Sequence, residues 1–284
     1  MTNKITLICA ASLLISSCNA KKECNVTSPD NQLTFALSVE NGTPIYTIDY
    51  NGKTVIKPSS LGFELTDGSI IGRGMRLDSV AHSTFDETWV PVWGENDSIR
   101  NHYNQMIAYM SSDDLRLNVE VRVFDDGIGF RYVFPSSGDT IYVAEELTQF
   151  AMPSDLTAWW IPGDYDTQEY AYNTTKLSGI RGVNEGIDNS DNVSTSAFSP
   201  TGVQTSLLLR DDTDSLYINL HEAALINYPA MHLNLNDTTM VFTSWLTPGM
   251  EVEKAKIVTP FATPWRVVMV GSATDILASD IIYR

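Results

Sequence analysis

One segment near the middle of the chain gathers two tryptophans and three carboxylates within eleven positions: Trp159, Trp160, Asp164, Asp166 and Glu169. Hard cations such as calcium take carboxylate oxygens as ligands, and the flat face of a tryptophan suits a sugar ring or a protein core. The spacing does not follow an EF-hand loop, which has its own order of acidic positions and a glycine. The pattern indicates a calcium or carbohydrate site. The alternative is a solvated acidic loop beside a tryptophan-filled core.

Two other segments, 85–103 with His102 and 219–225 with Glu222, also concentrate polar and aromatic side chains. Glycosidases place two carboxyl groups across the bond that they cleave, so Glu169 and Glu222 are the pair to test. The sequence does not set their separation. The four histidines show no zinc-ligand spacing, and a structural hydrogen bond is the alternative role for each of them. The chain has no G-x-S-x-G elbow, P-loop or H-E-x-x-H motif.

The charge of the chain excludes one class of function. The formal net charge is -17, with only 18 Lys and Arg among 284 residues. A nucleic-acid surface needs clustered cationic side chains to neutralise phosphates, so we expect no nucleic-acid partner. Hydrophobic residues make up 43% and charged residues 19%, which suits an ordinary globular core. An acidic surface is compatible with a neutral ligand, a cation or simple solubility.

The N-terminus has the pattern of an export signal. Lys4 precedes an apolar run from Ile5 to Ile15, which is too short to cross a bilayer as a mature helix. We expect residues 1–18 to be a lipoprotein signal, because small residues directly precede Cys18, the predicted site of lipidation. Ordinary signal-peptidase cleavage after Ala20 is the alternative. Both readings place the protein outside the cytoplasm, in the periplasm or on the outer membrane as a lipoprotein.

The body of the chain reads as a succession of short strands. Alternating apolar residues and two Asn-Gly turns predict an antiparallel meander over 33–56, and a second hairpin is predicted over 115–134. The helix-like pieces are short, at 221–225 and 274–279. We therefore predict an all-β fold, a large antiparallel β-sandwich with few short helices. The long connections 85–103, 158–172 and 188–205 are expected to be irregular and to carry function.

The chain resembles glycoside hydrolase family 97 in many strings, several of them tryptophan-bearing, that occur in the same order over nearly all of the sequence after the signal. These strings include Thr84-Phe85-Asp86-Glu87-Thr88-Trp89, Pro91-Val92-Trp93-Gly94-Glu95, Arg100-Asn101-His102-Tyr103-Asn104, Trp160-Ile161-Pro162-Gly163-Asp164-Tyr165-Asp166-Thr167-Gln168-Glu169-Tyr170, Tyr217-Ile218-Asn219-Leu220-His221-Glu222 and Thr263-Pro264-Trp265-Arg266.

The resemblance implies the N-terminal domain of a calcium-dependent α-glucosidase. Residues 25–280 would form a galactose-mutarotase-like β-supersandwich that packs on a catalytic (β/α)₈ barrel, and that barrel is absent from this chain. A barrel needs roughly 250 further residues. The family cleaves α-glucosidic bonds, and some members cleave α-galactosides. The resemblance makes Glu169 a ligand of a shared calcium site, incomplete in this chain.

No catalytic residue is assigned to the chain, which we expect to be inactive alone. His102, Asp164 and Glu222 are candidates for lining the shared cleft that binds α-linked glucose oligosaccharides, with internal structural hydrogen bonds as the alternative role. Two further hypotheses stay open. The chain could be a free-standing carbohydrate-binding protein at the cell surface, or a structural β-sandwich without a ligand.

Overall fold

The computed structural model describes residues 24–113, 115–187 and 197–284. Tight turns with left-handed backbone connect its first strands. Asn41 and Gly42 have φ values of 51° and 82°, and Asn51 and Gly52 have φ values of 50° and 76°. Asparagine and glycine tolerate this conformation better than other residues. The predicted antiparallel meander is confirmed, and its last strand ends at Ser60.

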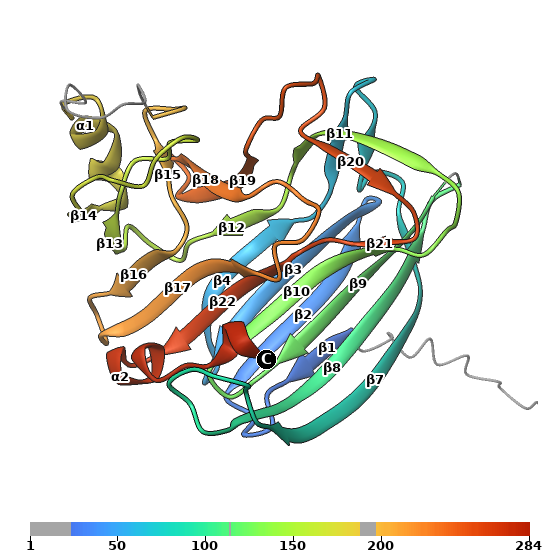
Figure 1. The fold of residues 1–284 in the computed structure, drawn as a ribbon, viewed down its shortest axis with the longest axis horizontal. Helices are drawn as coiled ribbons and strands as arrows, with labels where there is room; N and C mark the ends of the chain where they lie inside the picture. Colours follow the sequence, from blue (N-terminus) through green and yellow to red (C-terminus); the bar gives the residue numbers. More distant parts are fainter. Residues whose placement is uncertain (1–23, 114, 188–196) are drawn as a thin grey trace, which may run out of the picture.

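Eight strands pair in one antiparallel sheet. They are β1 (Asn25–Thr27), β2 (Leu33–Glu40), β3 (Thr43–Tyr50), β4 (Lys53–Ser60), β12 (Gln149–Ala151), β15 (Gly202–Val203), β18 (Met231–Asn236) and β19 (Val241–Leu246). The order across the sheet is β1-β2-β3-β4-β12-β19-β18-β15. Strand β12 therefore joins the strands of the first sixty residues to strands from near residue 240, so the sheet connects distant parts of the chain (Figure 1).

A second sheet has ten strands. They are β7 (Arg76–Trp89), β8 (Ile99–Ser111), β9 (Arg116–Val123), β10 (Gly127–Phe134), β13 (Thr157–Trp160), β14 (Asn173–Lys176), β16 (Leu207–Asp211), β17 (Leu216–Ala223), β21 (Phe261–Ala262) and β22 (Trp265–Gly271). The order is β14-β13-β16-β17-β22-β10-β9-β8-β7, and β21 pairs with β10. The predicted hairpin over 115–134 is β9 and β10.

A four-stranded sheet and a few short helical turns complete the described part of the chain. The strands are β5 (Phe63–Leu65), β6 (Ile70–Ile71), β11 (Thr140–Glu146) and β20 (Ala255–Val258), and the helical turns are η1 (Leu177–Gly179), α1 (Ile180–Asn184), α2 (Ala273–Leu277) and η2 (Ile281–Tyr283). No helix among the described residues is both long and apolar enough to cross a membrane.

The hydrophobic core lies between the two large sheets. Alternate residues of the strands point into it, as the period of two requires. Phe35 stacks on Tyr46 with ring centroids 5.2 Å apart, and Phe130 of the opposite sheet lies 5.0 Å from Tyr46. Burying one such side chain stabilises the fold by roughly 1.5–3 kcal/mol. The all-β sandwich predicted from the alternation is confirmed.

Three local predictions meet different outcomes. The predicted helix at 221–225 is wrong, because residues up to Ala223 belong to β17, which pairs with β22 from Tyr217 to Ala223. A long paired neighbour outweighs weak local helix propensity there. The irregular connection predicted over 85–103 is wrong at both ends, which belong to β7 and β8, and holds for residues 90–98. The helix predicted at 274–279 is confirmed as α2, whose start is stabilised by a capping box of Ser272 and Asp275.

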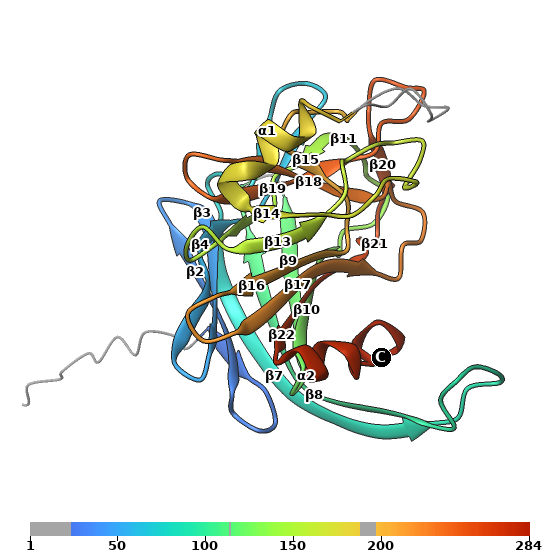
Figure 2. The same cartoon turned by 90° about the vertical axis from the view of Figure 1, so that its left-hand side faces the viewer.

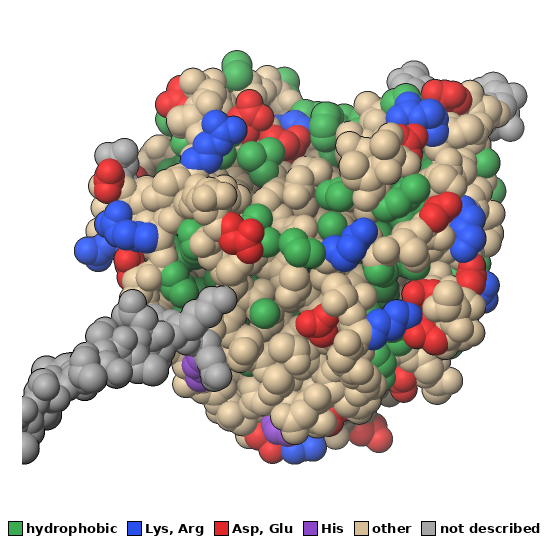
Figure 3. Space-filling view, turned by 180° about the vertical axis from the view of Figure 1, so that it is seen from behind, with side chains coloured by type: hydrophobic (Ala, Val, Ile, Leu, Met, Phe, Trp, Pro, Cys, Tyr) green, Lys and Arg blue, Asp and Glu red, His purple; other side chains and the backbone are tan. Residues whose placement is uncertain are grey.

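Strands β7 and β8 form a long hairpin that projects from the body of the domain (Figure 2). We call its free end, residues 85–103, the arm. At the tip, Trp93 is 88% exposed and Val92 is 99% exposed, and Phe85, Trp89 and Val90 are also exposed. The arm, the C-terminus and the connection between β13 and β14 reach out on the same side of the molecule (Figure 2). On the face shown in Figure 3, apolar side chains are scattered among charged and other atoms.

Candidate functional site

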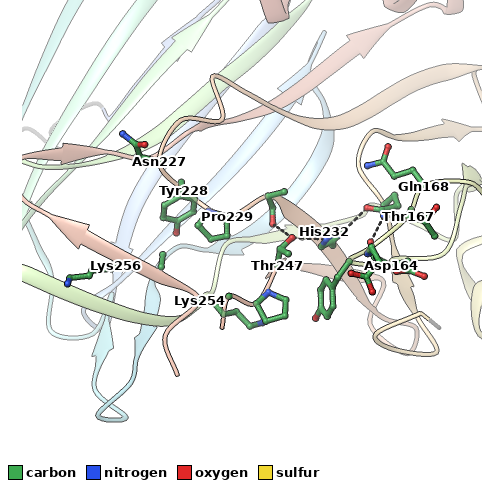
Figure 4. Close-up of a pocket in the computed structure, with 17 residues that line it drawn as sticks. Asp164, Thr167, Gln168, Asn227, Tyr228, Pro229, His232, Thr247, Lys254 and Lys256 are labelled. Atoms are coloured by element: carbon green, nitrogen blue, oxygen red, sulfur yellow. Dashed lines mark hydrogen bonds between the residues drawn. The ribbon is translucent and has the colours of Figure 1, made fainter. Parts of the chain in front are cut away.

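A cavity of about 630 Å³ opens where three connections meet: the one after β13, the one between β17 and β18, and the one after β19. Asp164, Gln168, Tyr228, His232 and Lys254 are among the residues that line it (Figure 4). The lining residues that lie in strands belong to β18 of the first sheet and to β20 of the four-stranded sheet, and the others lie in connections. A concave site with a few polar groups that converge on it is where small ligands usually bind.

The loop that carries the predicted metal ligand closes on itself through Asp164. This residue is only 3% exposed. Its Oδ1 accepts a hydrogen bond of 2.9 Å from the backbone N–H of Asp166, and its Oδ2 accepts one of 2.6 Å from the hydroxyl of Tyr170. Thr167 Oγ1 accepts a further bond of 3.0 Å from the backbone N–H of Glu169. We call residues 164–170 the acidic loop. Asp164 ties its two ends together.

A hydrogen-bonded chain of three side chains supports the acidic loop from behind. Gln204 Nε2 donates to the carbonyl oxygen of Asp164 at 2.7 Å. Gln204 Oε1 lies 2.5 Å from His232 Nδ1, and His232 Nε2 lies 3.0 Å from Thr247 Oγ1. Burial lowers the pKa of His232 to about 4, because a charged imidazole would lose its hydration. The ring is therefore neutral at pH 7.

Three aromatic rings form a continuous stack beside His232. Phe198 lies between Tyr165, at 5.3 Å and 12°, and Trp245, at 5.4 Å and 5°. The indole N–H of Trp245 also donates to the hydroxyl of Tyr165. Two glycines leave room for the central ring: a Cβ added at Gly163 would lie 2.3 Å from an atom of Phe198, and one at Gly202 would lie 2.7 Å away. The three rings mainly cover one another's faces by stacking.

A buried ion cluster forms the opposite support, under the connection between β17 and β18. Arg266 makes two hydrogen bonds to the carboxylate of Glu146, at 2.9 and 2.7 Å, and a third of 2.7 Å to Glu222. Glu222 Oε1 accepts a bond of 3.0 Å from the backbone N–H of Met231, and Tyr228 donates to Glu146 at 3.0 Å. The cluster thereby places Tyr228 in the cavity wall.

The structure brings some of the predicted site residues together and separates others. Asp164 lines the cavity, whereas Glu169 does not, although its neighbour Gln168 does. Glu222 lies behind the wall, with both carboxylate oxygens engaged by Arg266 and Met231. His102 is half-buried on β8, paired in register with Asp86, and it does not line this cavity.

Trp160 lies in the core, and Trp159 lies at the surface. Trp160 is fully buried, and its indole N–H donates to Thr175 Oγ1 at 2.9 Å. The alternative of a tryptophan-filled core therefore holds for Trp160. Trp159 is half-buried, stacks on Tyr217 at 6.1 Å, and carries the guanidinium of Arg210 over its ring.

The described residues supply part of the ligand set of a metal site and not a complete one. Calcium takes six to eight oxygen ligands. Within the described residues, no group of three or more His, Cys, Asp or Glu side chains is placed to hold a metal ion. Glu169 is exposed, and no other described side chain bonds to its carboxylate. Asp164 is committed to its own loop. The acidic loop exposes two carboxylates, Asp166 and Glu169, which are too few to complete a calcium site without ligands from elsewhere.

Sequence reasoning missed Gln204, His232 and Arg266. These residues are isolated in the sequence, and nothing in their spacing predicts that Gln204 and His232 meet the acidic loop. Only the pairing of β15 with β18 brings residues 204 and 232 into contact. Arg266 appears in the sequence comparison only as the last residue of a Thr-Pro-Trp-Arg string.

Comparison with known proteins gives a consistent result. The family model described as Glycosyl-hydrolase 97 N-terminal matches residues 26–284. A retaining α-galactosidase of Bacteroides thetaiotaomicron is 26% identical over 312 residues, covering 99% of this chain and 43% of the relative. A probable retaining α-galactosidase of Streptomyces bingchenggensis is 27% identical over 251 residues, covering 87% of this chain and 35% of the relative.

Solved structures extend the comparison. A glycoside hydrolase family 97 enzyme from Pseudoalteromonas sp. strain K8, in complex with acarbose, superposes with a TM-score of 0.77 at 32% identity. The match covers 90% of this chain and 37% of that one. A second structure of an enzyme from the same strain contains panose. The chain thus spans less than half the length of the relatives that it matches.

Proposed function

We propose, because the chain belongs to glycoside hydrolase family 97 as its N-terminal domain, that it is the supporting half of a calcium-dependent α-glucosidase. In this proposal it packs on a catalytic barrel, lends Glu169 to a shared calcium site, and forms part of the sugar-binding cleft. The chain itself carries out no chemistry. The observation that carries the proposal is the exposed carboxylate of Glu169, presented by a loop that is closed and supported from behind.

The arrangement suits a lent ligand. A calcium site made by one protein domain alone would group several carboxylates, whereas here Glu169 stands apart from Asp164, which is tied to Asp166 and Tyr170. A bound calcium ion would supply a fixed positive charge beside a sugar hydroxyl or a developing negative charge. Glu169 would help to hold that charge, and the walls of the cavity would orient the sugar.

The comparisons support two kinds of sugar as the substrate. The two relatives compared by sequence are α-galactosidases at 26% and 27% identity, whereas the enzyme with acarbose bound is 32% identical. Panose, found in a further structure, is built from α-linked glucose units. The greater identity to the acarbose-bound enzyme supports α-linked glucose oligosaccharides as substrates of the whole enzyme. An α-galactoside is the alternative.

The arm and the C-terminal residues offer the surface for the catalytic domain. Trp93 and Val92 at the tip are almost fully exposed, and Leu277, Ile282 and Tyr283 near the C-terminus are exposed as well. Large apolar side chains gathered on one side of a domain mark an interaction site. The arm, the C-terminus and the connection that contains the acidic loop share one side (Figure 2), so one partner could cover all three.

Export is a separate proposal. The lipoprotein signal over residues 1–18 and the lipidation of Cys18 fall outside the described residues. They rest on the sequence alone, together with periplasmic or outer-membrane localisation. Mass spectrometry of the cell-derived protein checks them: a diacylglycerol-modified Cys18 at the N-terminus is expected, and an unmodified N-terminus after Ala20 would contradict lipidation.

Complementation tests the proposed function. A catalytic domain of a family 97 enzyme, made without its own N-terminal domain, is assayed on p-nitrophenyl α-glucoside and α-galactoside with calcium present. Adding this chain is expected to restore hydrolysis, and Glu169→Gln is expected to lose most of that gain. Asp166→Asn, an exposed neighbour in the same loop, is the matched control and is expected to restore as well as the parent. Equal restoration by Glu169→Gln and the parent would contradict the calcium role.

A further inference from the structure

Buried, uncharged side chains outside the acidic loop support its backbone. Gln204 is 4% exposed and His232 is 5% exposed. Gln204 follows β15, and His232 lies on β18, the strand beside it. Neither residue belongs to the loop, yet Gln204 Nε2 reaches its backbone at two points, the carbonyl oxygen of Asp164 at 2.7 Å and that of Thr167 at 3.4 Å. Glu169 is two residues beyond the second point.

Hydrogen-bond chemistry gives this contact a direction. The amide nitrogen of Gln204 faces carbonyl oxygens, which only accept. Its amide oxygen therefore faces His232, so His232 Nδ1 must carry the proton and donate. The remaining nitrogen, Nε2, is then an acceptor and lies 3.0 Å from the hydroxyl of Thr247, which is also 3.2 Å from the carbonyl oxygen of Ala230. A neutral imidazole has one donor and one acceptor, so it fits this chain in a single orientation.

We propose that Gln204 and His232 are positioning residues, which fix the backbone of the acidic loop and thereby the direction in which Glu169 points. Gln204 holds the carbonyl groups of Asp164 and Thr167, His232 donates to the amide oxygen of Gln204, and Thr247 contacts the other ring nitrogen of His232. This inference rests on the proposed role of Glu169 as a metal ligand. A lent ligand must be held in place, because the described residues group too few carboxylates to orient a cation by themselves.

Figure 4 shows the geometry on which the inference depends. Thr247 and His232 lie on one side of the cavity, with Thr167 and Asp164 of the acidic loop beside them, and dashed lines mark hydrogen bonds between these segments. Gln204 makes the link between His232 and the acidic loop. The three segments come from β18, from the connection after β19 and from the acidic loop. Loss of one link leaves buried polar groups without partners, which costs more than the hydrogen bond itself.

Hydrogen–deuterium exchange of the full chain tests the positioning. In the peptide that covers residues 164–170, Gln204→Met and His232→Leu are expected to raise exchange about tenfold, since each removes a link that holds the loop closed. His232→Asn keeps a donor near the position of Nδ1 and is expected to restore most of the protection. Thr247→Val, which removes only the last hydroxyl, gives a smaller rise. Exchange in the β2–β3 hairpin is expected to stay at the parent value in every variant.

Terbium(III) luminescence separates positioning from the role of Glu169. Terbium is a hard cation that takes the same oxygen ligands as calcium. Gln204→Met and His232→Leu are expected to weaken terbium binding about tenfold, the lower end of the loss seen when residues behind a metal ligand are removed, and His232→Asn is expected to recover it. Glu169→Gln is expected to weaken binding without changing exchange in the loop. Unchanged terbium binding in Glu169→Gln would contradict the metal role alone. Unchanged exchange in both Gln204→Met and His232→Leu would overturn the positioning inference, whatever Glu169 does.

Discussion

Arg266 holds Glu222 inside the domain: Arg266 Nη1 lies 2.7 Å from Glu222 Oε2, and the arginine side chain is completely buried. The same guanidinium binds Glu146, so one cation neutralises two carboxylates. A carboxylate that lines a substrate cleft needs an oxygen to offer, and both oxygens of Glu222 are taken. The geometry favours the structural alternative for Glu222, and its candidacy for the cleft stays a prediction.

The first prediction concerns this cluster. Arg266→Met is expected to lower the free energy of unfolding by about 3–5 kcal/mol, because it leaves two buried carboxylates without their cation. Arg181→Met is the control, since Arg181 pairs with Asp237 at the surface and such pairs contribute about 1 kcal/mol or less. Urea titrations followed by tryptophan fluorescence measure both. Losses of equal size in the two variants would contradict the account of the cluster.

The second prediction is a pH dependence that comes from His232. Burial has the largest effect on the pKa of His232 and lowers it from 6.5 to about 4. The charge of Asp164 raises this pKa, and the charge of Lys254 lowers it. Between these two values the unfolded chain binds a proton that the folded chain does not. The free energy of unfolding therefore falls as the pH drops from 6.5 to 4, by roughly 3 kcal/mol at most from this residue.

Replacing the ring checks the assignment. His232→Asn cannot titrate, so its unfolding free energy is expected to fall less steeply than that of the parent over this pH range. Urea titrations at closely spaced pH values give both curves. Parallel curves for the parent and the variant would show that another group causes the slope.

The third prediction concerns the glycines beside the aromatic stack. Gly163→Ala would place a methyl group 2.3 Å from Phe198, and we expect a loss of about 1–3 kcal/mol as the ring is displaced. Gly182→Ala is the control, because this glycine lies in α1 with nothing within 4 Å of an added Cβ. Alanine in a helix is favoured by up to about 1 kcal/mol. Thermal unfolding distinguishes them, and a gain of stability in both variants would contradict the packing argument.

The fourth prediction tests the arm as a contact surface. Trp93→Ser is expected to leave the unfolding free energy within about 0.5 kcal/mol of the parent, since this side chain is exposed. It is expected to weaken binding to the separate catalytic domain about tenfold or more, as loss of a central aromatic side chain does at interfaces. Val258→Ser, exposed on β20 of the four-stranded sheet, serves as the control. Calorimetric titration that gives the two variants equal affinities would exclude the arm.

Local sequence signals were sufficient for most of the fold. Asn41-Gly42 and Asn51-Gly52 require left-handed backbone in a tight turn, so the hairpins around them follow from short-range sterics. The alternation of apolar residues in β9 and β10 follows from their two-faced environment. The strand at 216–223 was missed at its end, because its partner β22 lies almost fifty residues further along the chain.

The candidate site was harder to predict for a physical reason. Asp164 and Glu169 belong to one short segment, so their proximity needed no fold. Gln204, His232 and Thr247 come from three segments whose contact depends on the order of strands in the first sheet. These residues become a hydrogen-bonded chain only when the folded sheet buries them together, and no local sequence pattern encodes that contact. The resemblance to a family identified Glu169, and only the structure shows what supports it.

The most direct test of the central claim is the hydrolysis of p-nitrophenyl α-glucoside and p-nitrophenyl α-galactoside by the purified chain alone, with and without calcium. The account predicts no release of p-nitrophenol from either substrate in either condition, because the proposed function assigns the catalytic groups to the partner barrel. Calcium-dependent release by the chain alone, lost in Glu169→Gln, would contradict it and would place the catalytic carboxylates within residues 26–284.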